Sequence, residues 1–98
     1  MQGGFKGADI VYAKTWTPVL TTINQEEGKR IHAKHIDWIT DDEILALAAA
    51  DSIYLYPLPA DREIEVANSV IDSSHSVAYD QAENRMHAQK AVMALTMR

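Results

Sequence analysis

The stretch SIYLYPLP, from Ser52 to Pro59, decides the fold class of this 98-residue chain. β-branched and aromatic residues in a short apolar run favour a strand. Pro57 and Pro59 then end the strand, because proline has no amide proton to donate to a sheet ladder. This strand and its proline turn are the centre from which the neighbouring elements can be assigned.

Two segments lie before this strand in the first third of the chain. ADIVYAKTW, residues 8–16, contains the apolar run Ile10–Tyr12 and predicts a buried strand. Residues 19–30 are mixed in character, so either a short helix or a loop is expected there. Gly28 would end it.

TDDEILALAAAD, residues 40–51, is the clearest helix in the sequence. Thr40 and Glu43 have the spacing of a capping box, in which each side chain accepts a bond from the backbone amide of the other residue. The two aspartates after Thr40 suit the positive end of the helix dipole. A helix is therefore predicted just before the strand that begins at Ser52.

A helix, a strand and a second helix are expected after the proline turn. Residues 62–72 carry apolar side chains along one side and predict a helix. HSVAY, residues 75–79, predicts a third short strand. The last helix covers residues 82–97, with Asp80 and Glu83 as its capping residues and its methionines as core filler.

Strands that alternate with helices predict an α/β fold with parallel strands. About three strands are visible, whereas a complete doubly wound sheet has more strands and helices on both faces. Residues 1–98 are therefore predicted to form one partial, doubly wound domain with a mainly parallel sheet and flanking helices. Ligands bind beyond the carboxyl ends of such strands. Here those ends lie at residues 14–18, 56–62 and 79–85.

Composition and charge argue against several classes of function. The formal charge is -5 and the nine basic residues are scattered, whereas nucleic-acid binding needs clustered Lys and Arg. The chain has no cysteine, which excludes a disulfide framework and a Cys-type zinc site. No apolar run approaches the roughly 18 residues of a membrane span. The first residues do not resemble a signal peptide, so a cytoplasmic protein is expected.

Two arginines are candidates for ligand binding. The turn at residues 55–62 can present backbone carbonyls and Arg62 to a ligand, or it can be a stiff loop with a solvated arginine. Arg85 lies near the start of the last helix, on the flank of its apolar face. It either holds an anionic or carbonyl ligand or reaches out to water or a carboxylate.

His32 and His35 are three residues apart, a spacing at which two histidines can share a helix face and a metal ion. No third ligand follows at a suitable spacing. The sequence therefore favours a solvated pair and predicts neither a metal site nor a cofactor.

Three stretches, in matching order and at matching spacing, resemble the C-terminal part of the ornithine and aspartate carbamoyltransferase superfamily. They are GADIVYAKTW, LYPLPADR and, most specific, SVAYDQAENRMHAQKAVMAL at residues 76–95. YAKTWTP, followed by a longer insert and DWITDDEILAL, resembles the knotted branch most. That branch includes acetylornithine and succinylornithine carbamoyltransferases.

The resemblance implies a reaction and roles for particular residues. In this family an N-terminal domain binds carbamoyl phosphate and a C-terminal domain binds the amino acid, whose amine attacks the carbamoyl carbon as phosphate leaves. By position, Arg85 matches the arginine that holds and polarises the carbamoyl oxygen, and Leu58 matches a residue whose backbone carbonyl orients the amine. By resemblance, Trp16 and its neighbours match the substrate loop of the family. Together with the argument from the proline turn, this makes Lys14, Trp16, Pro57, Leu58 and Arg62 the predicted substrate-binding residues.

Several positions depart from the family pattern. Tyr56 and Pro57 stand where the ornithine enzymes have His and Cys. Lys14 replaces the aspartate of the ornithine-type substrate loop, and Pro18–Leu20 replaces its Ser-Met-Gly. Classical ornithine specificity is therefore not expected.

The carbamoyl-phosphate motif of the family is absent from these 98 residues. The first interpretation is a partial carbamoyltransferase domain that is inactive alone. The alternative is a self-associating structural or small-anion-binding module, because an exposed parallel edge invites pairing. Small domains also gain stability from oligomerisation, so a homo-oligomer is predicted.

Overall fold

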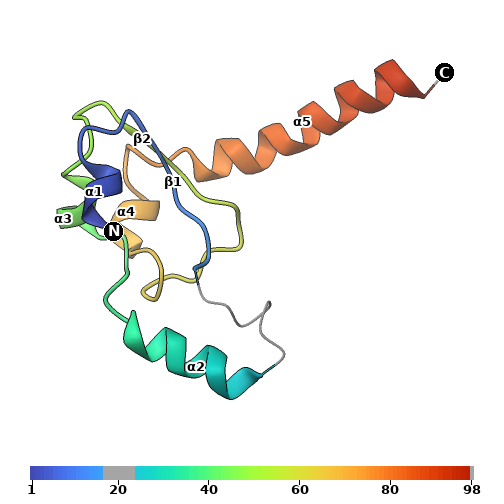
Figure 1. The fold of residues 1–98 in the computed structure, drawn as a ribbon. Helices are drawn as coiled ribbons and strands as arrows, with labels where there is room; N and C mark the ends of the chain where they lie inside the picture. The colour runs from blue at the N-terminus through green and yellow to red at the C-terminus, as the bar shows by residue number, and fades with distance from the viewer. Residues whose placement is uncertain (17–23, 98) are drawn as a thin grey trace.

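Two parallel strands form the centre of the computed structural model, which describes residues 1–16 and 24–97 (Figure 1). Strand β1 is Ile10–Tyr12 and strand β2 is Ile53–Leu55. They pair in parallel along their whole length, with helices between them in the sequence. The predicted α/β fold class with parallel strands is confirmed.

The predicted third strand at residues 75–79 is reduced to a single bridged position beside β2. The Tyr54 amide donates to the His75 carbonyl at 2.8 Å, and the Tyr54 carbonyl accepts from the Val77 amide at 2.9 Å. The pairing stops there because helix α5 begins at Ala78. The described part of the sheet therefore has two strands and one bridge.

Helix α3, Asp42–Leu45, is a single turn where residues 40–51 predicted a longer helix. Its cap is Asp41, whose carboxylate accepts a bond from a backbone amide of the helix at 2.8 Å. Thr40 is buried instead, and its amide donates to the Glu65 carbonyl at 2.9 Å. The predicted capping box is wrong because the backbone of Thr40 belongs to a long-range bridge.

Helix α4, Asn68–Ile71, occupies only the end of the helix predicted at residues 62–72. Glu63 has a φ of 61°, a left-handed conformation that interrupts a right-handed helix. The Glu63 amide donates to the Val66 carbonyl at 2.8 Å. The residues before α4 therefore form a turn.

Helix α2, Gln25–Lys34, continues through Gly28, which the sequence predicted as an end. The Asn24 side chain caps the helix by accepting a bond from the Glu26 amide at 3.1 Å. A satisfied N-terminus offsets part of the cost of an interior glycine. Of residues 19–30, positions 19–23 lie outside the described residues.

Helix α5, Ala78–Thr96, starts earlier than predicted and extends away from the rest of the molecule (Figure 1). Val77 precedes it without a side-chain capping bond, so Asp80 and Glu83 lie inside the helix and do not cap it. Ala78 is its only buried residue. The helix is therefore anchored at its first turn.

The methionines of α5 do not fill the core, contrary to the interpretation from the sequence. Met86 is 47 % exposed and Met93 is 48 % exposed. The two methionines do lie on one face of α5, as their spacing predicts, but no described element covers that face.

The core lies between the strands, α4 and the short helix α1, Gln2–Phe5. The largest fully buried side chains are Tyr54, Tyr56, Val66, Val70 and Ile71. Strand β1 contributes Val11, whereas Ile10 and Tyr12 are 60 % and 59 % exposed, so the prediction of a buried strand is only partly right.

No helix in the described part of the chain is long and apolar enough to cross a membrane.

Candidate functional site

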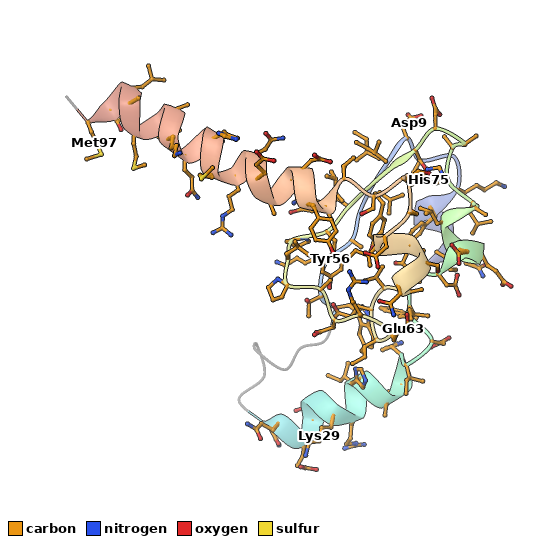
Figure 2. All side chains as sticks on the ribbon, turned by 180° about the vertical axis from the view of Figure 1, so that it is seen from behind. Asp9, Lys29, Tyr56, Glu63, His75 and Met97 are labelled. Atoms are coloured by element: carbon orange, nitrogen blue, oxygen red, sulfur yellow. The ribbon has the colours of Figure 1, made fainter. Side chains whose placement is uncertain are left out.

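A hollow of about 540 Å³ lies where the end of β1, the turn after β2 and the first turns of α5 meet. Figure 2 shows Tyr56 beside the root of α5, with Met97 at the far end of that helix. The lining residues are Tyr12, Tyr56, Pro57, Leu58, Gln81, Ala82, Asn84, Arg85 and Ala88. The carboxyl ends of both strands contribute, as expected for a parallel sheet.

Arg85 reaches this hollow from α5. The residue is exposed, and its guanidinium has no hydrogen-bond or ion-pair partner among residues 1–16 and 24–97. A guanidinium presents five donors in a planar fork suited to carboxylate, phosphate or carbonyl oxygens. Its donors are therefore available to a ligand in the hollow.

Pro57 and Leu58 also line the hollow. Both are half-buried, and they follow directly on β2. Three of the residues singled out from the sequence, Arg85, Pro57 and Leu58, are thus brought together from positions far apart in the chain.

Tyr12 and Gln81 close one side of the hollow, and sequence reasoning had missed both. The Gln81 amide nitrogen donates to the Tyr12 hydroxyl at 3.1 Å. The Gln81 side-chain oxygen is buried without a hydrogen-bond partner in the described structure. The only signal for them was position, since one ends a strand and the other follows the predicted third strand.

Arg62 does not line the hollow, and its guanidinium, although exposed, is engaged by neighbouring side chains. Its guanidinium donates to both carboxylate oxygens of Asp72, at 2.6 and 2.8 Å. It also donates to Asn68 at 2.7 Å and to the Tyr79 hydroxyl at 2.8 Å. The hydrogen bonds from Arg62 lower the pKa of Asp72. Arg62 therefore joins α4 to the start of α5.

Lys14 and Trp16 also lie away from the hollow. Lys14 is exposed. The Trp16 ring stacks on His32, with centroids 5.3 Å apart and planes 6° apart, and meets Trp38 edge-on at 5.8 Å. His35 also contacts both tryptophans, so the histidines form an aromatic cluster rather than a solvated pair. The departure at Pro18–Leu20 lies outside the described residues.

A buried acidic side chain lies behind the wall of the hollow. Glu65 is 3 % exposed, and its Oε2 accepts hydrogen bonds from the Tyr56 hydroxyl and, at 3.2 Å, from the Thr15 hydroxyl. Burial, and then the bond to Glu65, raise the pKa of Tyr56 above its ordinary value. The sequence had placed Glu65 in the helix predicted at residues 62–72, the first part of which is a turn, so its burial was not foreseen.

Comparison with protein families gives one match over nearly the whole chain. The family model described as "Aspartate/ornithine carbamoyltransferase, Asp/Orn binding domain" matches residues 2–96. The ornithine carbamoyltransferases of Thermococcus kodakarensis and Aromatoleum aromaticum are 44% and 43% identical over 92 and 88 residues. These matches cover 94% and 90% of this chain. The chain spans about 28% of the length of these curated relatives.

Solved structures show the same fold. The chain is similar to ornithine carbamoyltransferase from Pyrococcus furiosus, with a TM-score of 0.81 and 38% identity over 98% of this chain and 30% of that one. It is similar to acetylornithine transcarbamylase complexed with acetylcitrulline, with a TM-score of 0.84 and 36% identity over 96% of this chain and 28% of that one. A mutant of N-acetyl-L-ornithine transcarbamylase, with the same TM-score, is complexed with carbamyl phosphate and N-succinyl-L-norvaline.

Proposed function

This chain belongs to the aspartate/ornithine carbamoyltransferase family by its Asp/Orn-binding domain, and we propose that it forms the amino-acid side of a carbamoyl-transfer site. It is a partial domain of that family, spanning about 28% of curated relatives. Carbamoyl phosphate and an amino-acid amine are the proposed substrates of the whole enzyme. A cytoplasmic location stays a prediction.

One observation carries the proposal: Arg85, Pro57 and Leu58 line a single hollow. A carbamoyl group has one oxygen that gains charge when an amine attacks, and it needs a donor at that point. Arg85 supplies such a donor and has no competing partner among the described residues. The turn at Pro57 and Leu58 carries backbone carbonyls that can accept from an amine.

The proposed roles are those that the family resemblance implies, and the shared hollow supports them. The neutral amine nitrogen forms a bond to the carbamoyl carbon, and the bond from that carbon to the phosphate oxygen breaks. The phosphate leaves with the electron pair of that bond and takes up the proton that the amine releases. The Arg85 guanidinium donates to the carbamoyl oxygen and stabilises its developing charge. The Leu58 carbonyl accepts from the attacking amine and aims its lone pair at the carbon.

The 98-residue chain alone is expected to bind without turnover. Holding both reactants in the attack geometry can contribute roughly 7–11 kcal/mol to a transfer reaction. The described residues provide one wall of such a site. A colorimetric assay for ureido products, with carbamoyl phosphate and either L-ornithine or N-acetyl-L-ornithine, is expected to show background only, and turnover by the isolated chain would contradict this expectation.

Binding is the direct test of the site. Carbamoyl phosphate and N-acetyl-L-ornithine are titrated into ¹⁵N-labelled chain, and shifts are expected at residues that line the hollow. Arg85→Ala removes charge-assisted hydrogen bonds and should weaken binding by about 10- to 100-fold. Lys90→Ala is the matched control, since it removes an exposed cation from the same helix outside the hollow. Equal effects of the two variants would refute a role for Arg85.

Self-association is a second candidate function, favoured by apolar side chains that no described element covers. Val92 is 59 % exposed and Leu95 is 72 % exposed on α5, and Ile10 is 60 % exposed on β1. Apolar surface of this kind favours association. We propose that a second copy of the chain covers it, as the sequence had suggested.

Sedimentation velocity at micromolar concentration tests the second candidate. The chain is expected to sediment as a dimer or larger oligomer, and Val92→Glu with Met93→Glu should make it monomeric. Lys90→Glu makes the same change in net charge at another position of the helix and should leave the oligomer intact. A monomeric unsubstituted chain would rule this candidate out without affecting the first.

A further inference from the structure

We propose that Glu65 is a positioning residue that ties the segment after β1 to the proline turn after β2. This inference rests on the proposed function, because it concerns how the two segments that flank the amino-acid site are held in register. Neither segment contains Glu65, which lies in the turn before α4.

Backbone hydrogen bonds on both sides hold Glu65 in place. Its amide donates to the Asp61 carbonyl, and its carbonyl accepts from the Thr40 amide, both at 2.9 Å. Its side chain is 3 % exposed. A carboxylate at this depth requires hydrogen-bond donors, because burial removes those that water would supply.

The hydrogen-bond donors to the Glu65 carboxylate come from two different segments of the chain. The Thr15 hydroxyl, three residues past β1, donates to Oε2 at 3.2 Å. The Tyr56 hydroxyl, from the residue after β2, donates to the same oxygen. One carboxylate oxygen therefore joins two segments that are about forty residues apart in the sequence.

Both donors to Glu65 lie next to predicted substrate-binding residues. Tyr56 lines the hollow and directly precedes Pro57 and Leu58. Thr15 directly precedes Trp16, whose ring lies in the aromatic cluster with His32 and Trp38. A shift of either donor is thus transmitted through Glu65 to the other segment, as expected for groups that share one buried acceptor.

The test measures Trp16 in the 98-residue chain without any ligand. The Trp16 indole nitrogen is buried, so its N–H exchange with solvent reports how well the segment is held. Thr15→Val is expected to raise the exchange rate by about tenfold, consistent with loss of a bond to a charged group. Tyr56→Phe is expected to raise it as well, although Tyr56 belongs to the other segment.

Tyr54→Phe is the matched control. Its ring lies beside that of Tyr56, with centroids 6.5 Å apart, and it removes a buried hydroxyl that makes no hydrogen bond to Glu65. The control is expected to leave Trp16 exchange unchanged. In the Thr15→Val background, Tyr56→Phe should have no further effect, because the connection is already broken.

The inference would be overturned if Trp16 N–H exchange were unchanged in either Thr15→Val or Tyr56→Phe. It would also be overturned if Tyr56→Phe and Tyr54→Phe had equal effects on that exchange. The exposed position of Thr15 makes its variant safe for folding. Because no ligand is present, failure of this test differs from failure of the proposed function, which would appear as absent binding in the unsubstituted chain.

Discussion

At the scale of single residues, two arginines with similar sequence surroundings have different roles. Arg62 follows strand β2 and Arg85 follows the predicted third strand, and both lie near acidic residues in the sequence. Arg62 is held by Asp72 and Tyr79, whereas Arg85 has no partner among the described residues. The difference arises because α4 ends close to the turn that carries Arg62. This placement depends on tertiary packing.

The ion pair of Arg62 predicts a specific pH dependence. The pKa of Asp72 lies below its ordinary value of 3.8 because Arg62 donates hydrogen bonds to it. The contribution to stability is therefore present above pH 3.8 and is lost as the pH falls through the lowered pKa. Asp72→Asn should lower the unfolding temperature at pH 7 and have little effect at the acid end of that range.

Thermal unfolding followed by circular dichroism between pH 2 and pH 7 checks this prediction. Asp37→Asn provides a control, since Asp37 is exposed and makes no ion pair in the described structure. A loss of stability in Asp72→Asn that is the same at every pH would contradict the assigned cause.

At the scale of elements, the sequence predicted whether a segment forms a helix or a strand better than it predicted the length of that element. The strands β1 and β2 were found because apolar runs bounded by turn signals identify strands. Helix α3 is short because Thr40 is drawn into a bridge with the turn around Glu65. Helix α4 is short because Glu63 takes a left-handed conformation. Both limits come from contacts outside the element.

Helix α5 offers a prediction at this scale. Residues 82–96 of the helix are exposed, and Ala78 alone is buried. Removing residues 91–98 should therefore reduce the helical signal but leave the unfolding temperature of the monomer nearly unchanged. Ala78→Leu, in contrast, should destabilise the chain by about 1–3 kcal/mol through overpacking. Circular dichroism on dilute samples measures both.

A large fall in unfolding temperature after the truncation would mean that the outer turns of α5 contact the body of the molecule in solution.

At the scale of the whole molecule, a small core supports the fold. Few side chains among residues 1–16 and 24–97 are fully buried, and the principal dimensions of 50 × 40 × 21 Å reflect the projecting helix. A chain of this length has a total stability of at most about 5–15 kcal/mol. Each buried aliphatic side chain is therefore a large part of the whole.

Ile71→Ala tests this dependence. Ile71 is 1 % exposed, and truncation of a buried isoleucine costs about 2–5 kcal/mol. Urea unfolding should show a clearly lower midpoint. Ile36→Ala removes the same atoms from a side chain that is 70 % exposed and should change the midpoint little. Similar midpoints for the two variants would show that the core lies elsewhere.

The sequence by itself determined the parallel α/β class, the two strands, the family and the meeting of Arg85 with the Pro57–Leu58 turn. The family follows from the three matching motifs. The site follows because the carboxyl ends of parallel strands lie at one edge of a sheet, whatever the details of packing. Tertiary structure alone decided that Arg62 pairs with Asp72, that Glu65 is buried and that the methionines of α5 are exposed. Periodicity identifies an apolar face, but only packing decides what covers it.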